Sequence, residues 1–404
     1  MIWQPLLDGE PARAALQLAR TIAREVAKLT GASVDRTVFW AYASHALDEP
    51  FASAAYDAAL ADLVAQVTAG GAHPMLYNEG LSGMGWALAH VIDDSDGLLA
   101  RIDRSLLEHV AQPSWSGDHD LTQGLVGYGV YFLERLRGTE PADHAREGLE
   151  RIVDHLAATA EHTADGARWF TRPDLMQPHI RALWPHGRYD CGMAHGSAGI
   201  VALLARAAAL PDPPTAARAL GHDAARWLIA QRQAPSAIGG RFPALLVPAA
   251  PGAPFAPGEP SRSAWCYGDL GVAAALWSAE QHLGIAGGLA HDTVLDGILR
   301  PTTHVNIEDV ALCHGSAGIA HLYNRFYQAT RDPAFGDAAR QWYAATVVTD
   351  TLEALPGYAL WGAHWHRLLD GAMGVGLALF AAATRTEPAW DRILLCDLPT
   401  ASLA

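Results

Sequence analysis

Lysine is almost absent from this 404-residue chain: Lys28 is the single lysine, and arginine supplies the rest of the 28 positive charges. We attribute this to genome composition rather than to function. Charged residues are only 18 % of the chain and hydrophobic residues 50 %, which excludes a largely disordered protein. The formal net charge of −15 argues against nucleic acid as a partner, because binding phosphates needs a basic surface.

Long apolar runs and a dense set of cysteines are also missing. No window of about 18 residues is both uncharged and strongly apolar, so no membrane span is predicted. The first residues lack the basic and apolar segments of a signal peptide. The four cysteines are too widely spaced for a disulfide framework. Together these absences favour a cytoplasmic protein with free thiols.

A Gly-x-x-Gly step followed by an apolar helical segment recurs six times. The intervals between the steps are 44, 72, 72, 47 and 56 residues, and each can hold two helices. The steps begin at Gly80, Gly124, Gly196, Gly268, Gly315 and Gly371.

Two kinds of helix are predicted between these steps. The segment 200–210, directly after a step, is apolar nearly all round, whereas segment 217–231 carries polar residues on one face. Helical periodicity also covers 11–29, 142–160 and 333–355. Because strand patterns are scarce, we predict an all-α fold, with an inner ring of buried helices inside an outer ring of amphipathic ones.

Two stretches are expected to be irregular, 170–189 and the proline-rich 233–261. The repeat continues across both, so we predict one domain over residues 1–404 rather than two joined by a linker.

The residue immediately before each step is polar or ionisable every time. If the inner helices form a closed ring, these side chains meet at one end of it and line a cavity. They are Glu79, Gln123, His195, Tyr267, His314 and Asp370.

Two of the steps carry a cysteine in the same register. Cys266 lies two residues before Gly268, and Cys313, followed by His314, lies two residues before Gly315. Two thiolates and one imidazole form a three-ligand zinc set with an open fourth position, as catalytic zinc sites have. The mixed ligands favour zinc over iron or copper. The structural alternative is two buried thiols and a loop histidine.

The remaining metal-binding residue types fit a structural role better. Cys191 lies four residues before His195 but is outside the register of the other two cysteines, so a buried thiol is favoured. Cys396 is predicted to be structural. The pair His364 and His366 precedes a step rather than lying in one, which favours a loop or rim position.

Acid–base candidates lie near the same register, each with a structural alternative. Asp120 and His195 are equally compatible with proton transfer or with a helix cap and a loop contact. Arg262 is equally compatible with holding an enolate-like charge or with solvation. Tyr267 suits proton donation or a buried hydrogen bond, and Trp265 suits a substrate contact or packing.

A zinc site with two thiolate ligands favours thiol activation over water activation. The thiolates neutralise the charge of the metal, which makes it a weaker Lewis acid for water. A substrate thiolate in the open position would have a lowered pKa and remain nucleophilic.

These motifs resemble the lanthionine synthetase C-like family of lanthipeptide cyclases, over residues from about 75 to the C-terminus. The resemblance implies an α/α toroid with zinc at Cys266, Cys313 and His314. It also implies that four residues assist the addition and protonation steps: Asp120, His195, Arg262 and Tyr267. The matching segments are 120–127 (DLTQGLVG), 194–199 (AHGSAG), 265–271 (WCYGDLG), 313–318 (CHGSAG) and the tail 390–395 (WDRILL).

The chain departs from the family at its N-terminus. The family has seven glycine-step repeats and this chain has six, while residues 34–60 have a helical pattern without a step. We interpret residues 1–75 as a degenerate first repeat.

The resemblance implies a zinc-dependent cyclase for lantibiotic-type peptides. Its substrate would be a precursor whose Ser and Thr residues a separate dehydratase has dehydrated, and its product a thioether ring. One alternative is a relative that adds glutathione to dehydroamino acids. Another is a non-catalytic, zinc-stabilised toroid that binds peptides.

Overall fold

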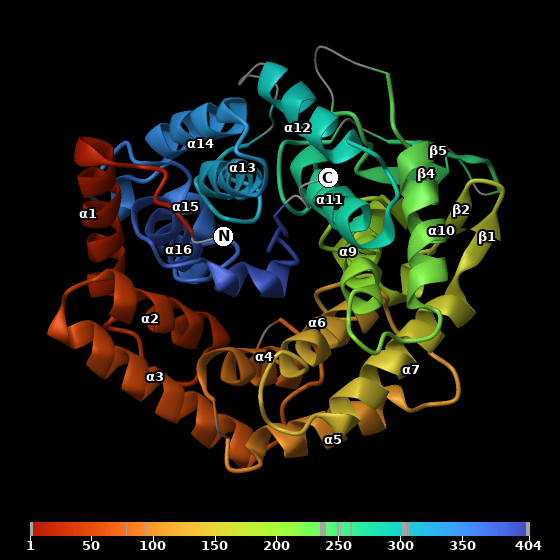
Figure 1. Cartoon of the computed structure of the whole chain (residues 1–404), viewed down its shortest axis with the longest axis horizontal. Helices are drawn as coiled ribbons and strands as arrows, with labels where there is room; N and C mark the ends of the chain where they lie inside the picture. Colours follow the sequence, from red (N-terminus) through yellow and green to blue (C-terminus); the bar gives the residue numbers. More distant parts are fainter. Residues whose placement is uncertain are drawn as a thin grey trace.

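Two concentric rings of helices make up the protein, as the sequence predicts (Figure 1). The computed structural model describes residues 3–77, 79–93, 95–234, 240–248, 250, 252–258, 261–300, 305 and 307–400. Within these residues the inner ring consists of α2 (Val34–Ala46), α4 (Leu81–Val91), α6 (Leu125–Arg135), α9 (Ser197–Ala208), α11 (Asp269–Leu283), α13 (Ser316–Thr330) and α16 (Ala372–Ala383). Consecutive members contact each other and α16 contacts α2, so the ring is closed.

Each inner helix has an outer partner that packs against it. The outer helices, in the order of their partners from α2 to α16, are α3 (Pro50–Ala69), α5 (Leu98–Val110), α7 (Asp143–Thr159), α10 (Ala217–Ala230), α12 (Leu289–Leu299), α14 (Pro333–Thr346) and α1 (Gly9–Val26). The N-terminal helix α1 therefore covers the last inner helix, and the two ends of the ring overlap.

Sequence periodicity decides which ring a helix joins. In α1 the buried residues are Ala15, Leu18, Ala19, Ile22, Ala23 and Val26, which form a single stripe at helical spacing. In α9 and in α6 every residue is buried, because neighbours cover these helices on all sides. The predicted helix over 333–355 is wrong in its last turns: α14 ends at Thr346, where the β-branched run 346–349 begins.

The glycine steps let the preceding loop fold back onto the first turn of each inner helix. At Gly318 a Cβ atom would lie 1.8 Å from the carbonyl oxygen of Leu312, and at Gly271 it would lie 2.0 Å from that of Trp265. Real side chains do not tolerate such distances, so glycine is required there for close approach. Because Leu312 and Trp265 directly precede the two cysteines, this fold-back fixes where the thiols lie.

Backbone hydrogen bonds join these step loops into a belt around one rim of the ring. Each loop donates to the next one: Tyr77 N to Thr122 O (3.2 Å), Leu121 N to Ala194 O (3.1 Å), Met193 N to Cys266 O (2.9 Å), Trp265 N to Cys313 O (3.2 Å) and Cys313 N to Leu369 O (2.9 Å). The belt thereby sets the spacing between the step loops.

Side chains close the belt at α2, which has no glycine step. The carboxylate of Asp35 accepts a hydrogen bond from Leu368 N (3.0 Å), in the loop before α16. On the other side, Glu79 accepts one from Val34 N (2.9 Å), the first residue of α2. The helix α2 thus occupies the seventh inner position, and we propose that it is the remnant of a repeat that lost its glycines.

The two longest intervals between steps contain short elements outside the rings. They are β1 (Glu161–Thr163), β2 (Gly166–Arg168), the 3₁₀ helix η1 (Pro173–Leu175), α8 (Pro178–Leu183), β3 (Tyr189–Asp190), β4 (Leu245–Pro248) and β5 (Phe255–Pro257). The strands pair antiparallel as β1–β2 and as β3–β4–β5. Of the predicted irregular stretch 233–261, positions 235–239, 249, 251, 259 and 260 lie outside the described residues.

The C-terminal segment lies inside the ring (Figure 1, deep blue). In its 3₁₀ helix η5 (Ala389–Leu394), the buried Asp391 binds Arg325 of α13 at 2.6 and 2.7 Å and His321 at 2.7 Å. The next residue, Arg392, donates to Glu134 of α6 (3.0 Å). The C-terminal tail therefore links two inner helices, α6 and α13, that are far apart in the sequence.

Smaller elements follow α14: the 3₁₀ helices η3 (Leu352–Ala354) and η4 (Gly362–His364) and the short α15 (Tyr358–Trp361). Among the described helices, none combines the length and the apolar character that crossing a membrane requires.

Candidate active site

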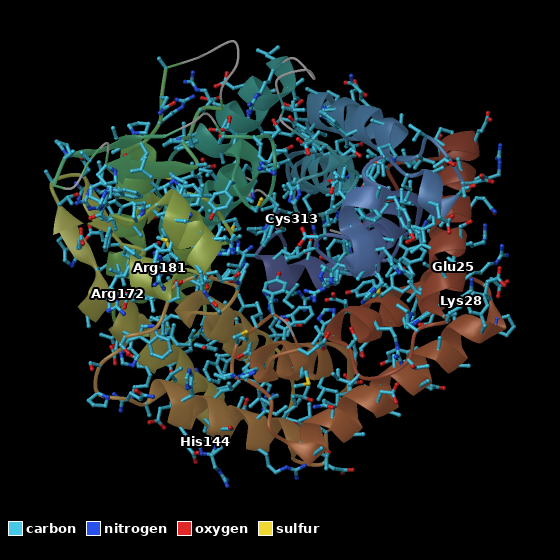
Figure 2. All side chains as sticks on the ribbon, turned by 180° about the vertical axis from the view of Figure 1, so that it is seen from behind. Glu25, Lys28, His144, Arg172, Arg181 and Cys313 are labelled. Carbon is cyan, nitrogen blue, oxygen red and sulfur yellow. The ribbon has the colours of Figure 1, made fainter. Side chains whose placement is uncertain are left out.

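Two thiols and one imidazole converge at the rim that carries the step loops. The ligand atoms of Cys266, Cys313 and His314 all lie within 4.8 Å of one another. Among the residues that the structure describes, these three form the cluster of side chains that could hold a metal ion. Both cysteines are buried, at 7 % and 9 % exposure. Figure 2 shows Cys313 near the middle of the ring. The predicted cluster is therefore formed by the fold.

The surroundings of this cluster fit a zinc ion. The hydrogen bond from Cys313, together with the nearby His314 and Arg262, holds the pKa of the Cys266 thiol well below its usual range, and the same bond raises the pKa of the Cys313 thiol well above it. Two carboxylates flank the imidazole of His314: Asp309 lies 4.0 Å from Nε2 and Asp370 lies 3.8 Å from Nδ1. Carboxylates that orient a histidine ligand are common around zinc, and the donor set leaves a fourth position for substrate.

A hydrogen-bonded pair, His195 and Asp120, lies beside the cluster, and His195 lines the same cavity. Nδ1 of His195 lies 2.6 Å from Oδ2 of Asp120, which is 2 % exposed, whereas His195 is 36 % exposed. The carboxylate also accepts hydrogen bonds from the Thr122 hydroxyl (2.7 Å) and from Gln123 N (2.8 Å). These hydrogen bonds fix the position of the Asp120 carboxylate. Because Nδ1 of His195 is bound to it, the opposite edge of the imidazole, with Nε2, faces solvent.

This pairing decides the charge of His195. Burial disfavours the imidazolium, but the hydrogen bond and the charge of Asp120 outweigh it and raise the pKa of His195 to about 8. The same bond helps to hold the pKa of Asp120 below its usual range despite burial. Near neutral pH the site therefore holds an imidazolium, which is a proton donor.

Tyr267 is held against this pair by contacts that the sequence did not indicate. Its ring stacks on His195 with centroids 5.7 Å apart, and its hydroxyl lies 3.4 Å from Arg188. Arg188 in turn donates to Asp190 (2.9 Å), which also accepts from Thr171 (3.1 Å). Burial raises the pKa of Tyr267 well above its usual range, so its hydroxyl is protonated.

A cavity of about 940 Å³ contains the cluster, and we call it the central cavity. Five of the six residues that precede the steps line it, which confirms their predicted convergence; Gln123 borders a neighbouring cavity instead. Arg262 is half-buried and lines the central cavity together with both cavities beside it.

The other sequence candidates lie where a structural role explains them. Cys191 and Cys396 are buried outside the cluster, and all four cysteines are free. Trp265 is 2 % exposed and its indole N–H donates to Leu394 O (3.0 Å), although its ring borders the central cavity. Of the predicted rim pair, His364 is exposed at the wall of a neighbouring cavity, and the half-buried His366 lines the central cavity itself. A substrate contact of Trp265 stays a prediction.

Sequence reasoning missed a second register. The residue six positions before the first glycine of a step is charged in four of the six repeats, and it lies against that glycine, in three of them through its backbone and at Gly315 through its carboxylate. These residues are Asp118, Asp190, Arg262 and Asp309. Aligning the repeats at this position would have indicated Asp190 and Asp309 together with Arg262.

The family model of the lanthionine synthetase C-like proteins matches residues 37–395. The chain belongs to this family. Among solved structures, a nisin cyclase is similar to it with a TM-score of 0.71, at 17 % sequence identity, over 95 % of this chain and 97 % of that one. No curated protein matches the sequence.

For a lanthionine synthetase C-like protein the double ring is the expected fold, and the similarity to nisin cyclase confirms the predicted all-α toroid. The match of the family model begins within α2, at residue 37, which is ahead of the first glycine step. The roles of the individual site residues stay predictions.

Proposed function

We propose that this protein is a zinc-dependent lanthipeptide cyclase. The observation that carries the proposal is the placement of Cys266, Cys313 and His314 in one cavity with His195, which Asp120 holds from behind. A zinc ion in that site would supply a Lewis acid that lowers the pKa of a substrate cysteine thiol. The substrate would be a peptide that a separate dehydratase has dehydrated.

The reaction joins the thiol sulfur of a cysteine to the β-carbon of a dehydroalanine or dehydrobutyrine. The electron pair of the broken C=C bond moves to the carbonyl of the same residue as an enolate, and the α-carbon then takes up a proton. The half-buried guanidinium of Arg262 lies on the cavity wall, where it stabilises the negative charge that develops on the enolate oxygen.

The α-carbon proton comes from His195 in this proposal. Asp120 keeps the imidazole protonated near neutral pH and fixes its orientation through Nδ1, so that Nε2 is the edge left for the substrate. Tyr267 supports the ring of His195 by stacking and keeps its own hydroxyl protonated beside the same cavity. The proton lost by the substrate thiol goes to solvent.

Incubating the zinc-loaded protein with a dehydrated, cysteine-containing peptide should remove free thiols without changing the peptide mass, because addition is an isomerisation. Alkylation followed by mass spectrometry counts the thiols that remain. Thiols that stay alkylatable contradict the cyclase. A control reaction that contains glutathione distinguishes the cyclase from a glutathione-adding enzyme. Only the latter increases the mass of the peptide by the mass of glutathione.

The cyclisation rate should fall above pH 8. The pKa of His195 is about 8 in the folded protein, so its imidazolium is present below this pH and is lost above it. On the alkaline side we expect kcat/KM to decrease about tenfold per pH unit. In Asp120→Asn the charge that raises this pKa is gone while burial remains, so the decline should begin at lower pH.

Two measurements check this assignment. The pH profile of kcat/KM is recorded for the unaltered protein and for Asp120→Asn, and the His195 ring is titrated by NMR in both. Asp154→Asn is the matched control, because Asp154 is an exposed carboxylate on the outer helix α7. An alkaline limb that stays in place in Asp120→Asn would assign the proton to a different donor.

A further inference from the structure

A cavity of about 800 Å³ opens beside the central cavity, and we call it the side cavity. The two share Thr122, His195, Arg262 and Tyr267 on their walls. Neither cysteine of the cluster nor His314 lines the side cavity. A peptide that runs from one cavity into the other therefore passes the acid–base residues and leaves the thiol ligands behind it.

The part of the side-cavity wall built by the insertions is mostly apolar, with Gln177 and His179 among its polar members. Leu175, Met176, Ile180 and Trp184 come from η1, α8 and the residues around them, and Leu245 and Val247 come from β4. All of these lie in the two longest intervals between glycine steps, outside both helix rings. The insertions therefore build a wall that the helices alone do not provide.

This wall is fastened to the catalytic loops. The guanidinium of Arg188 lies 4.4 Å from the centre of the Trp184 ring, and Arg188 also binds Asp190 and approaches the Tyr267 hydroxyl. Strand β4 pairs with β3 through Tyr189 and Leu246, and β3 leads into the loop of His195. These contacts fix the position of the apolar wall relative to His195, the proposed proton donor.

The chemistry of the addition tells which part of the substrate uses this wall. Both the attacked β-carbon and the α-carbon that is protonated belong to the dehydroamino acid, so that residue must face His195, while the cysteine lies at the thiol ligands. We infer that the side cavity binds the substrate segment that flanks the dehydroamino acid, and that its wall selects apolar side chains there. This inference rests on the proposed function.

The opposite side of the site has a different character. A third cavity of about 830 Å³ shares His314, Asp370, Arg262 and Arg367 with the central cavity. Glu308 and Asp309 also line it, so its wall carries charges of both signs, and we call it the polar cavity. Since this polar cavity adjoins a proposed zinc ligand rather than His195, it offers polar surroundings on the cysteine side. The two flanks of the substrate therefore meet surfaces of different polarity.

Two synthetic peptides of identical composition test the inference. Each carries one dehydroalanine and one cysteine at the same spacing; in one, two leucines flank the dehydroalanine and two glutamines flank the cysteine, and in the other these pairs are exchanged. We expect a KM about tenfold lower for the first peptide, an effect typical of one or two apolar contacts in a pocket. Ile180→Glu should remove this preference by raising KM for the first peptide about tenfold, with little change in kcat.

Leu183→Glu is the matched control, because Leu183 is 65 % exposed on the same helix α8 as Ile180 and lines none of the three cavities. It should leave KM for the first peptide unchanged. Val247→Thr, which changes shape little, should give a smaller shift in the same direction as Ile180→Glu and guards against misfolding. Equal KM values for the two peptides, or equal KM increases for both in Ile180→Glu, overturn the inference while the cyclase stands. If the unaltered protein cyclises neither peptide, the proposed function fails, and the inference fails with it.

Discussion

Replacing Cys313 by alanine should release the zinc from the protein and abolish thioether formation. Cys313, Cys266 and His314 are the protein donors that meet at the site, so the variant leaves two. Structural zinc sites bind with about 10–16 kcal/mol from four ligands, which makes one ligand worth about 3 kcal/mol, or about 100-fold in affinity. Ring formation should fall to the rate of the peptide alone.

The comparison with Cys191→Ala separates the loss of a ligand from the loss of a buried thiol. Both thiols are buried, Cys191 fully and Cys313 with 9 % exposure, but Cys191 lies outside the cluster. Zinc is counted per chain by elemental analysis after dialysis against a weak chelator, and circular dichroism checks the helix content. We expect zinc to be lost from Cys313→Ala and His314→Ala and kept in Cys191→Ala. Stoichiometric zinc in Cys313→Ala would remove this residue from the ligand set.

The register of the glycine steps made the site predictable from the sequence. Because every step folds back on its helix in the same way, residues at equal offsets from the first glycine occupy equivalent positions on one rim. Equal offsets therefore predict that Cys266, Cys313 and His314 lie together and that His195 lines the same cavity. The prediction requires only the repeat in the sequence and a closed ring of inner helices.

The contacts between different repeats could not be predicted in this way. Arg188 and Asp190 hold Tyr267 from an irregular segment whose strand β3 is two residues long and carries no alternating pattern. Asp35 and Glu79 replace a missing glycine step by side-chain hydrogen bonds to backbone groups far away in the sequence. Such pairings depend on how the insertions and α2 pack, which local periodicity does not encode.

The C-terminal tail is a further part whose role only the structure defines. The sequence showed a resemblance to the end of the family in the tail 390–395, without a partner for its charges. In the folded chain Asp391 is fully buried and binds both Arg325 and His321 of α13. Its indole neighbour Trp390 stacks on His321, with centroids 4.7 Å apart. The tail is therefore part of the core of the ring.

Replacing Asp391 by alanine should lower the free energy of unfolding by about 4 kcal/mol, the cost of leaving a buried charge without its partner. The guanidinium of Arg325 is 4 % exposed, and Asp391 binds its Nε and one terminal nitrogen at 2.6 and 2.7 Å. A second carboxylate near Arg325, that of Glu387, lies 3.7 Å away and is 59 % exposed, so it compensates little. The substitution changes no residue of the candidate active site, but it removes the contact that holds α13 to the C-terminal tail.

Chemical unfolding followed by circular dichroism measures this loss, with zinc at a fixed concentration because bound metal stabilises the folded state. The matched control is Asp337→Ala, which removes an exposed carboxylate that pairs with Arg340 at 3.0 Å on the outer helix α14. Exposed pairs of this kind contribute about 0.5 kcal/mol or less. Equal destabilisation by the two variants would show that Arg325 is hydrated or neutralised in the absence of Asp391. A large difference between them would instead show that the buried pair between the tail and α13 stabilises the fold far more than an exposed pair does.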